Sequence, residues 1–300
     1  MTAAIALPFR IGARTLWRVR RRLLRVSVSL EEALGGRVPP LPQSDGDGYL
    51  VTSVPADLLP QLLSKHRDLR PFVRQRYRRC YADLGLGFDA YIAGFSAKSR
   101  STLKRKVRRW ASGAGGAVDL RCYRTVADVD EFHRLARALS SRTYQERLLD
   151  AGLPQGEETL AKMRGLAAAD AMRGWILFLE GSPISYLYAP AESGTLIYAY
   201  LGYEPDFAHL SPGTVLQFEA MRQLMEEGHF RLFDFTEGEG QHKRLFSTGD
   251  VECVDLLLLK ATLPNLLAGW SLAGFDATVA LAKRAVRRLR LESLARRIRR

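Results

Sequence analysis

The segment 232–243 carries residue types that could perform acid–base chemistry. Asp234 interrupts the apolar run Leu-Phe-Asp-Phe, where a carboxylate is desolvated unless it is paired. Such a group could bind or deprotonate an incoming ammonium ion. The alternative is a structural carboxylate that pairs with Lys243 or with a nearby backbone N–H.

Further titratable residues occur near Asp234 in the sequence. Glu237 and Glu239 follow Asp234 in a loop and are alternative bases. His209 and His242 could move a proton near neutral pH, or could be ordinary surface histidines. Lys243 could hold a carboxylate or a phosphate, or could simply be solvated.

The sequence Ser211-Pro-Gly-Thr214 predicts the start of a helix that could bind an anion. Ser211 suits the N-cap position, and the proline suits the first helical position. The free N–H groups and the positive dipole end would face a phosphate, and Gly213 would permit close backbone approach. Ser211, Gly213 and Thr214 are therefore candidate ligand-binding residues, with an ordinary capped helix as the alternative.

Two tyrosines precede this helix in a strand predicted over 195–202. Tyr198 and Tyr200 alternate with Ile197 and Ala199, so we expect both phenols on one face of the strand. A phenol could protonate a leaving thiolate, and Tyr200 is a candidate for that role. The alternative is a pair of core aromatic residues.

A basic stretch, 95–110, contains seven Lys or Arg and no acid. Leu103, Val107 and Trp110 recur at helical spacing and predict one buried stripe, with Ser96 or Ser99 as the cap. The charges would face solvent or an anionic ligand. Arg100 and Lys104 are candidate contacts to a phosphate or an acidic substrate.

The net charge of +13 is concentrated at the two ends of the chain. Residues 1–25 carry seven Arg and no acid, and residues 261–300 carry nine basic residues and two acids. The remaining 45−7−9 = 29 basic residues face 32−2 = 30 acids. The body of the chain therefore lacks the basic excess typical of a DNA-binding protein.

The basic N-terminal segment predicts an amphipathic helix over 13–26. Its Leu, Val and Trp residues would group on one side and most arginines on the other, which suits the surface of an anionic membrane. The alternative is a helix packed on its own domain. The basic tail 261–300 is a second predicted helical segment.

Cysteine usage and hydropathy predict a cytoplasmic protein, with peripheral membrane binding through its ends. The three cysteines are scattered and match neither a disulfide framework nor a metal motif, so no metal is expected. We find no run of about 18 apolar residues and no uninterrupted apolar segment typical of a signal peptide.

The body predicts an α/β protein with a regular order of elements. Residues 1–34 form the basic helix, 35–48 a linker, 49–116 an N-terminal lobe, 117–260 a second lobe and 261–300 the tail. The second lobe reads as strand, two helices, a three-strand meander, a helix, a strand, a short helix and a strand.

This order resembles the GNAT acyltransferase fold, a mixed and mostly antiparallel sheet flanked by helices. Three segments resemble the CelD-like acetyltransferases, distant relatives of the FemABX aminoacyltransferases. They are Ser96-x-Lys-Ser-Arg100-x-x-Leu-Lys-Arg105, Gly202-Tyr203 followed by Leu210-Ser-Pro-Gly213, and Asp234-Phe-x-x-Gly238 followed by Lys243. The resemblance implies acyl transfer from a thioester, usually acyl-CoA, to an amine of a sugar, amino-acid or envelope and polysaccharide precursor.

Two departures from the pattern affect the donor and the site. The usual Arg/Gln-x-x-Gly-x-Gly/Ala loop is replaced by Ala208-His-Leu-Ser-Pro-Gly-Thr214, and the aromatic residue before the lysine is replaced by His242. An acyl-carrier protein or an aminoacyl-tRNA could therefore serve as donor in place of acetyl-CoA or another acyl-CoA. A FemABX-like transferase and a non-catalytic membrane-surface protein on the same scaffold are the alternatives.

Overall fold

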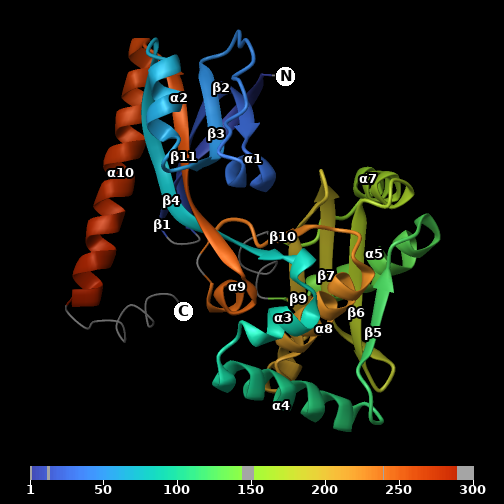
Figure 1. Ribbon diagram of the computed structural model, residues 1–300. Coiled ribbons are helices and arrows are strands. Elements are labelled where there is room, and N and C mark those ends of the chain that lie inside the picture. Colours follow the sequence, from blue (N-terminus) through green and yellow to red (C-terminus); the bar gives the residue numbers. More distant parts are fainter. Residues whose placement is uncertain (1, 12–13, 144–151, 239, 289–300) are drawn as a thin grey trace. The chain divides into compact units, whose positions relative to one another are not determined.

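The computed structural model describes residues 2–11, 14–143, 152–238 and 240–288 (Figure 1). The chain divides into unit 1, residues 1–77 and 252–300, and unit 2, residues 78–251. Both boundaries fall inside long strands, β4 (Leu69–Asp83) and β11 (Gly249–Lys260), so each of these strands contributes to both units. The sequence predicted that the N-terminal lobe ends at residue 116, and neither boundary of the two units lies there.

Unit 1 is a sheet with helices on both faces. The strand order is β1-β2-β3-β11-β4, in which β2 and β3 are parallel and the pairs β1–β2 and β3–β11 are antiparallel. One face packs against α1 and α2, and the other packs against α10. Its further elements are β1 (Ala3–Ile11), β2 (Arg14–Ser27), α1 (Leu30–Leu34), β3 (Gly48–Pro55), α2 (Leu59–Lys65) and α10 (Leu263–Arg288).

The prediction of a helix over 13–26 is wrong. Ala13 lies outside the described residues, and from Arg14 onward the segment is β2, antiparallel to β1. Leucine and arginine are good helix formers, but intrinsic propensity is a weak preference that tertiary pairing overrides. Here β1 supplies a full antiparallel partner, and Leu23 is buried in one core with Leu7.

Unit 2 is a mixed, mostly antiparallel sheet in the order β4-β10-β8-β7-β6-β5, with β9 paired to β7. The pair β8–β10 is parallel, and the other recorded pairs of this sheet are antiparallel. Its strands are β5 (Asp119–Tyr123), β6 (Met172–Leu179), β7 (Ser182–Glu192), β8 (Thr195–Ile197), β9 (Tyr200–Tyr203) and β10 (Leu232–Asp234). Its helices are η1 (Leu84–Leu86), α3 (Phe88–Ala93), α4 (Ala97–Gly113), η2 (Val126–Asp128), α5 (Val129–Ser140), α7 (Glu157–Ala168), η3 (Pro205–Leu210), α8 (Pro212–Glu227) and α9 (Gln241–Phe246).

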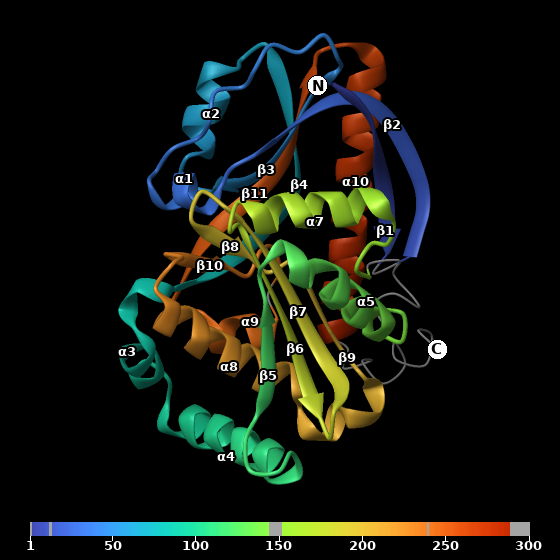
Figure 2. The same ribbon diagram turned by 90° about the vertical axis from the view of Figure 1, so that its right-hand side faces the viewer.

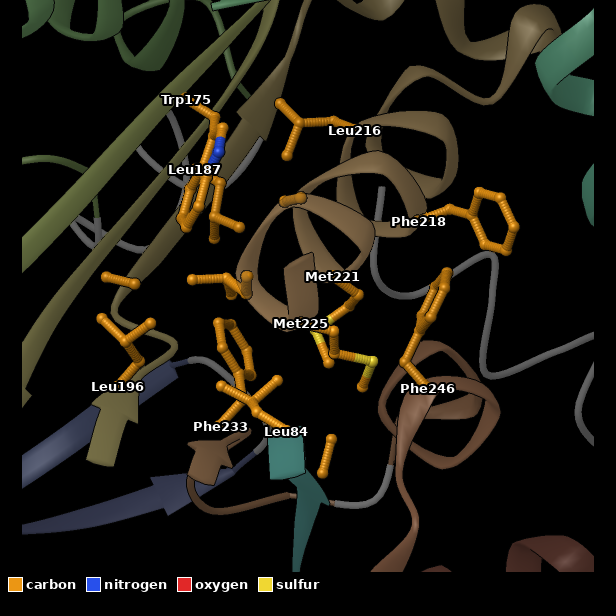
Figure 3. Close-up of a cluster of buried hydrophobic side chains, with 14 of the residues drawn as sticks. Leu84, Trp175, Leu187, Leu196, Leu216, Phe218, Met221, Met225, Phe233 and Phe246 are labelled. Atoms are coloured by element: carbon orange, nitrogen blue, oxygen red, sulfur yellow. The ribbon is translucent and has the colours of Figure 1, made fainter. Parts of the chain in front are cut away.

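Two cores lie on opposite faces of this sheet. Helices α5 and α7 cover one face, as Figure 2 shows, around Phe132 and Met163. Helices α3, α4, α8 and α9 contribute to the other core. Figure 3 shows the part of this core that α8 and α9 form with the strands. There Met221 and Met225 of α8 belong to one cluster with Phe233 of β10. Burial of these apolar residues therefore fixes α8 against the strands that border the candidate site.

Several local predictions are confirmed. Ser96 caps α4 by accepting from Ser99 N–H at 3.1 Å, and Leu103 and Trp110 are buried. At the start of η2, Thr125 N–H donates to Asp128 Oδ2 at 2.8 Å, as in a capping box. The described part of the tail, up to residue 288, continues α10, and residues 289–300 lie outside the described range. Within the described residues, no helix is both long and apolar enough to cross a bilayer.

A buried ion pair joins β6 to the C-terminal end of α8. The Arg173 side chain has no exposed surface; it donates to Asp170 at 2.6 Å and also to Glu227. We expect Glu227→Ala to lower the free energy of unfolding by about 3 kcal/mol, because it leaves a buried guanidinium without a main partner. Urea denaturation of both proteins measures the difference.

Glu226→Ala is the matched control for this prediction. Glu226 is the adjacent acid and pairs with Arg222 at 3.1 Å on the surface. Exposed pairs of this kind contribute less than about 1 kcal/mol. Equal losses for the two variants would show that the Arg173 pair does not stabilise α8 as inferred.

Candidate active site

A one-residue bulge interrupts the strand predicted over 195–202. Ala191 lies opposite Leu196, whereas Tyr188 lies opposite Tyr200, so the pairing with β7 shifts by one residue between β8 and β9. Ala199 N–H also donates to Tyr188 O at 3.2 Å. An extra residue of this kind bends the strand and redirects its side chains.

The strands β8 and β10 separate at this bulge. Their parallel pairing covers Thr195–Ile197 and Leu232–Asp234, and it ends where Tyr198 N–H donates to Asp234 O at 2.8 Å. Beyond that point β9 pairs with β7. In the part of the chain that the structure describes, no strand pairs with the other edge of β9. The site therefore borders an open strand edge.

Two backbone N–H groups point toward this open edge. Glu204 N–H donates to Ile184 O of β7 at 2.8 Å. Because N–H directions alternate along a strand, Leu201 and Tyr203 direct their N–H groups away from β7. A β-carbon added at Gly213 would lie 3.1 Å from Leu201 and 3.6 Å from Tyr203, so the first turn of α8 borders the same edge. These donors could bind a carbonyl or oxyanion.

The start of α8 differs from the expected cap. Ser211 occupies the N-cap position in the left-handed conformation, at φ 58° and ψ 49°, and its hydroxyl makes no capping bond. Thr214 N–H donates to Ser211 O at 3.0 Å, so this donor is used within the turn. Gly213 N–H has no acceptor among the described residues. Gly213 is also buried, and its missing side chain makes room for Leu201.

Asp234 is buried in an ion pair that the sequence did not indicate. Its Oδ2 accepts from Arg79 Nε at 3.0 Å and from Nη2 at 2.6 Å, and its Oδ1 accepts from Thr236 N–H at 2.7 Å. Both side chains are buried, since 2% of the Asp234 side chain and 9% of the Arg79 side chain are exposed. The expected backbone N–H partner is therefore present, and both carboxylate oxygens are already engaged. Asp234 holds the turn at which β10 ends.

Lys243 and His242 occupy the start of α9. Lys243 Nζ donates to Glu237 O at 2.5 Å and lies 3.4 Å from Thr236 Oγ1, so it closes the loop after β10. Burial lowers the pKa of Lys243, which Asp234 and Glu237 partly offset. Burial, together with Lys106 and Lys243, lowers the pKa of His242 to about 4. His242 is therefore a neutral imidazole near pH 7.

The bulge places the two tyrosines on opposite faces, contrary to expectation. The Tyr198 ring lies 6.3 Å from Phe233 and 6.0 Å from Phe235, on the α8 side of the sheet. The Tyr200 ring stacks on Tyr188 at 6.4 Å, in the core beneath α5 and α7. Burial raises the pKa of Tyr198, so its phenol stays protonated. Its hydroxyl has no hydrogen-bond partner within the described ranges.

The basic helix α4 borders the site. It packs against η3 and α8. Lys106 lies close enough to His242 to lower its pKa. Arg100 donates to Ala93 O at 3.0 Å, and Lys104 is exposed. Among the residues that the structure describes, no acid forms an ion pair with the basic side chains of α4, so this helix presents net positive charge.

Gln217 is a buried amide without a described partner. Its side chain has no exposed surface, and neither its oxygen nor its nitrogen has a hydrogen-bond partner within the described residues. Gly213, one turn earlier, contacts Leu201 of β9, and Met221, one turn later, packs in the core with Phe233 of β10. The amide therefore lies on the helix face between β9 and β10. Burying such an amide without a hydrogen bond costs about 1–3 kcal/mol.

The remaining predicted residues are distributed around this region. His209 is exposed on η3, where its ring contacts Asp206 O at 3.1 Å. Glu237 is exposed in the loop after β10, and Glu239 lies outside the described residues. Within the described ranges, no group of His, Cys, Asp or Glu is arranged to hold a metal. No sequence pattern distinguishes Arg79 or Gln217, because one arginine among many and one glutamine in a helix are ordinary.

Comparison with known proteins identifies the class of this domain. Residues 97–244, just under half of the chain, match the family described as the acetyltransferase (GNAT) domain. This part of the chain is similar to a GNAT acetyltransferase domain, and the protein is an acyltransferase. The mixed, mostly antiparallel sheet expected from the sequence is confirmed. The CelD-like type stays a prediction.

Two solved structures of low sequence identity share the fold. FemX is 11% identical, with a TM-score of 0.57 over 89% of this chain and 90% of its own. The C-terminal domain of a protein assigned as a lysylphosphatidylglycerol synthetase, from Agrobacterium fabrum, is 14% identical, with a TM-score of 0.50 over 77% and 72%. No curated protein matches the sequence.

The buried pair of Arg79 and Asp234 leads to a stability prediction. We expect Asp234→Asn to lower the free energy of unfolding by about 3 kcal/mol, because Arg79 keeps its charge in a buried position. The control is Asp250→Asn, which removes the partner of the neighbouring Arg78, at 3.6 Å on the surface. That variant should lose less than about 1 kcal/mol in the same denaturation experiment. Similar losses would contradict the inferred role of Asp234.

His242 leads to a prediction about acid sensitivity. Its pKa is about 4 in the folded protein and near 6.5 when unfolded, so protonation favours the unfolded chain as the pH falls below 6.5. Between pH 6.5 and 5 this one group should cost about 2 kcal/mol of stability. Denaturation at both pH values should show a loss smaller by that amount in His242→Gln. An unchanged loss would mean that His242 is hydrated in the native state.

Proposed function

We propose that this acyltransferase moves an acyl group from a thioester donor of the acyl-CoA kind to an amine. The acceptor would be a sugar, amino-acid or envelope and polysaccharide precursor. The observation that carries the proposal is the open edge of β9 beyond the bulge, beside the first turn of α8. Such an edge offers backbone donors and acceptors to an extended, amide-containing donor arm.

The reaction needs few specialised side chains. The neutral amine nitrogen attacks the thioester carbonyl carbon, the C–N bond forms and the C–S bond breaks. The amine loses one proton, and the departing thiolate gains one. Correct placement of the two reactants, together with hydrogen bonds to the developing oxyanion, supplies most of the acceleration in such a reaction.

Residues of this chain have distinct proposed roles in that reaction. The N–H groups of Leu201 and Tyr203 would bind the thioester carbonyl oxygen. The Tyr198 phenol would protonate the leaving thiolate, because burial keeps it protonated and its hydroxyl has no described partner. Asp234 would position the loop that carries Glu237, an exposed candidate base.

The phosphate groups of the donor would lie against the basic side of the site. Ser211, Gly213 and Thr214 form the start of α8, where the dipole favours an anion. The basic side chains of α4, including Arg100 and Lys104, add positive charge next to η3. The usual pyrophosphate-binding loop is replaced in this sequence, so we expect α4 to supply more of the contacts to the donor phosphates.

Aminoacyl transfer from tRNA is the second candidate. The similarity to FemX extends over 89% of the chain, including unit 1. The name of the Agrobacterium fabrum protein refers to a lysyl-bearing lipid, a product that contains an aminoacyl group. The exposed basic side chains of α4 would then bind tRNA phosphates in place of the phosphates of coenzyme A.

A thiol-release assay with a set of acyl-CoAs and mixed amine acceptors tests the proposal. We expect amine-dependent release, with kcat lowered by about a hundredfold in Tyr198→Phe, because general acid catalysis contributes at least that factor. Tyr200→Phe is the matched control, since its ring lies in the other core, and should keep wild-type kcat. A parallel reaction supplies aminoacyl-tRNA and measures transfer to the same acceptors.

The outcomes separate the candidates. Amine-dependent release with CoA thioesters supports the proposal, and transfer only from aminoacyl-tRNA supports the second candidate. If neither donor reacts, both proposed transfer reactions are wrong. If Tyr200→Phe lowers kcat and Tyr198→Phe does not, the proposed orientation of the two phenols in catalysis is wrong.

A further inference from the structure

Helix α10 of unit 1 has apolar residues on two faces. Ala268 and Leu272 are buried, and Leu272 belongs to the core beneath the helix. The opposite face is exposed and carries four large apolar side chains, which we call the α10 face. They are Leu263 (68% exposed), Leu267 (55%), Trp270 (58%) and Leu281 (62%). Their spacing follows one side of the helix, with Gly274 and Ala277 at the intervening positions.

Among the residues from 263 to 282 whose exposure is described, no exposed side chain of α10 carries a charge. The other exposed positions between Leu263 and Ala282 are Pro264, Ser271, Gly274, Ala277 and Thr278. The acid within α10 is Asp276, which forms an ion pair with Arg74 at 3.2 Å. A solvated helix face normally carries charged residues, so a face this apolar indicates a binding surface.

Basic residues occur at the C-terminal end of α10 and in the neighbouring hairpin. The last turns of α10 contain Lys283, Arg284, Arg287 and Arg288 in the sequence, with no acid among them. The hairpin β1–β2 packs beside the helix through Phe9 and Phe275, whose rings lie 5.2 Å apart. The exposed end of this hairpin carries Ile11, Leu16, Trp17 and the arginines Arg10 and Arg18. An apolar surface with exposed tryptophans is thus flanked by positive charge.

We propose that the α10 face and the tip of the β1–β2 hairpin bind the surface of an anionic lipid bilayer. Tryptophan and leucine would enter the interface between headgroups and acyl chains, and the flanking arginines and lysines would meet lipid phosphates. A second copy of the chain is a poorer occupant, because residues 1–25 contain no acid to pair with the arginines of a partner hairpin. This surface lies wholly within unit 1 and does not depend on the proposed reaction.

This surface differs from the one that the sequence indicated. The sequence predicted membrane binding by an amphipathic helix over 13–26, whereas the described part of this segment is a strand. In a strand the arginines and apolar residues of that segment do not form two broad helical faces. The apolar surface lies mainly on α10, and the hairpin supplies its basic border.

Vesicle flotation with the full-length protein tests the proposal. The probes are vesicles of equal parts phosphatidylglycerol and phosphatidylcholine, and vesicles of phosphatidylcholine alone. We expect binding to the anionic vesicles that weakens as salt is raised, and weaker binding to the neutral ones. Leu267→Ser with Trp270→Ser should reduce binding to anionic vesicles by roughly tenfold or more, because each side chain loses a favourable transfer from water.

The matched control removes apolar surface elsewhere. Leu86→Ser with Val126→Ser changes two exposed apolar side chains of unit 2, 48% and 46% exposed, and should leave binding unchanged. All substituted side chains are exposed, so circular dichroism should show wild-type folding. Sedimentation velocity of wild type and the α10 variant, without lipid, measures self-association.

Three results would overturn the proposal. The first is no flotation with anionic vesicles at low salt. The second is equal loss of binding in the α10 variant and the unit 2 control. The third is a stable wild-type dimer that the α10 variant abolishes, with no effect on vesicle binding, which would assign the α10 face to a second copy of the chain.

Discussion

The candidate site depends on one extra residue in a strand. The strand that begins as β8 pairs with β7 and β10 at the same time, but the additional residue at 198–199 shifts its pairing with β7. After that shift the strand follows β7 and leaves β10. One edge becomes open, Tyr198 and Tyr200 turn to opposite faces, and the first turn of α8 borders the exposed backbone. Without the bulge, ladder hydrogen bonds would occupy the donors that a ligand needs.

Charge is distributed unevenly around this open strand edge. On the β10 side, both oxygens of Asp234 are engaged by Arg79 and the backbone, and Lys243 donates to a backbone oxygen. On the α4 side, the positive charges have no ion-pair partner within the described residues. Burial lowers the pKa of His242 to about 4, so its imidazole is neutral near pH 7, and burial also lowers the pKa of Lys243 below its usual value. Positive charge is therefore concentrated next to α4.

The sequence predicted the parts of the fold that local patterns determine. The spacing of Leu103 and Trp110 identified the buried stripe of α4, and Ser96 was one of its two expected caps. It failed where long-range pairing decides. The N-terminal arginine-rich segment has a helical pattern, yet its pairing with β1 makes it a strand. The bulge and the pair of Arg79 and Asp234 join residues far apart in the chain, and no local pattern reports them.

The two ends of α8 are held very differently. Its C-terminal end is fixed by the buried Arg173 pair, and its middle by Met221, Met225 and their apolar neighbours. Its N-terminal end rests on Ser211 in a left-handed turn and on η3, a segment with no buried side chain. The N-terminal turn of α8 can therefore shift or be remodelled at little cost to the core, whereas a change at the C-terminal end would disturb the sheet. Substitutions within residues 205–210 should accordingly be tolerated better than substitutions around Arg173.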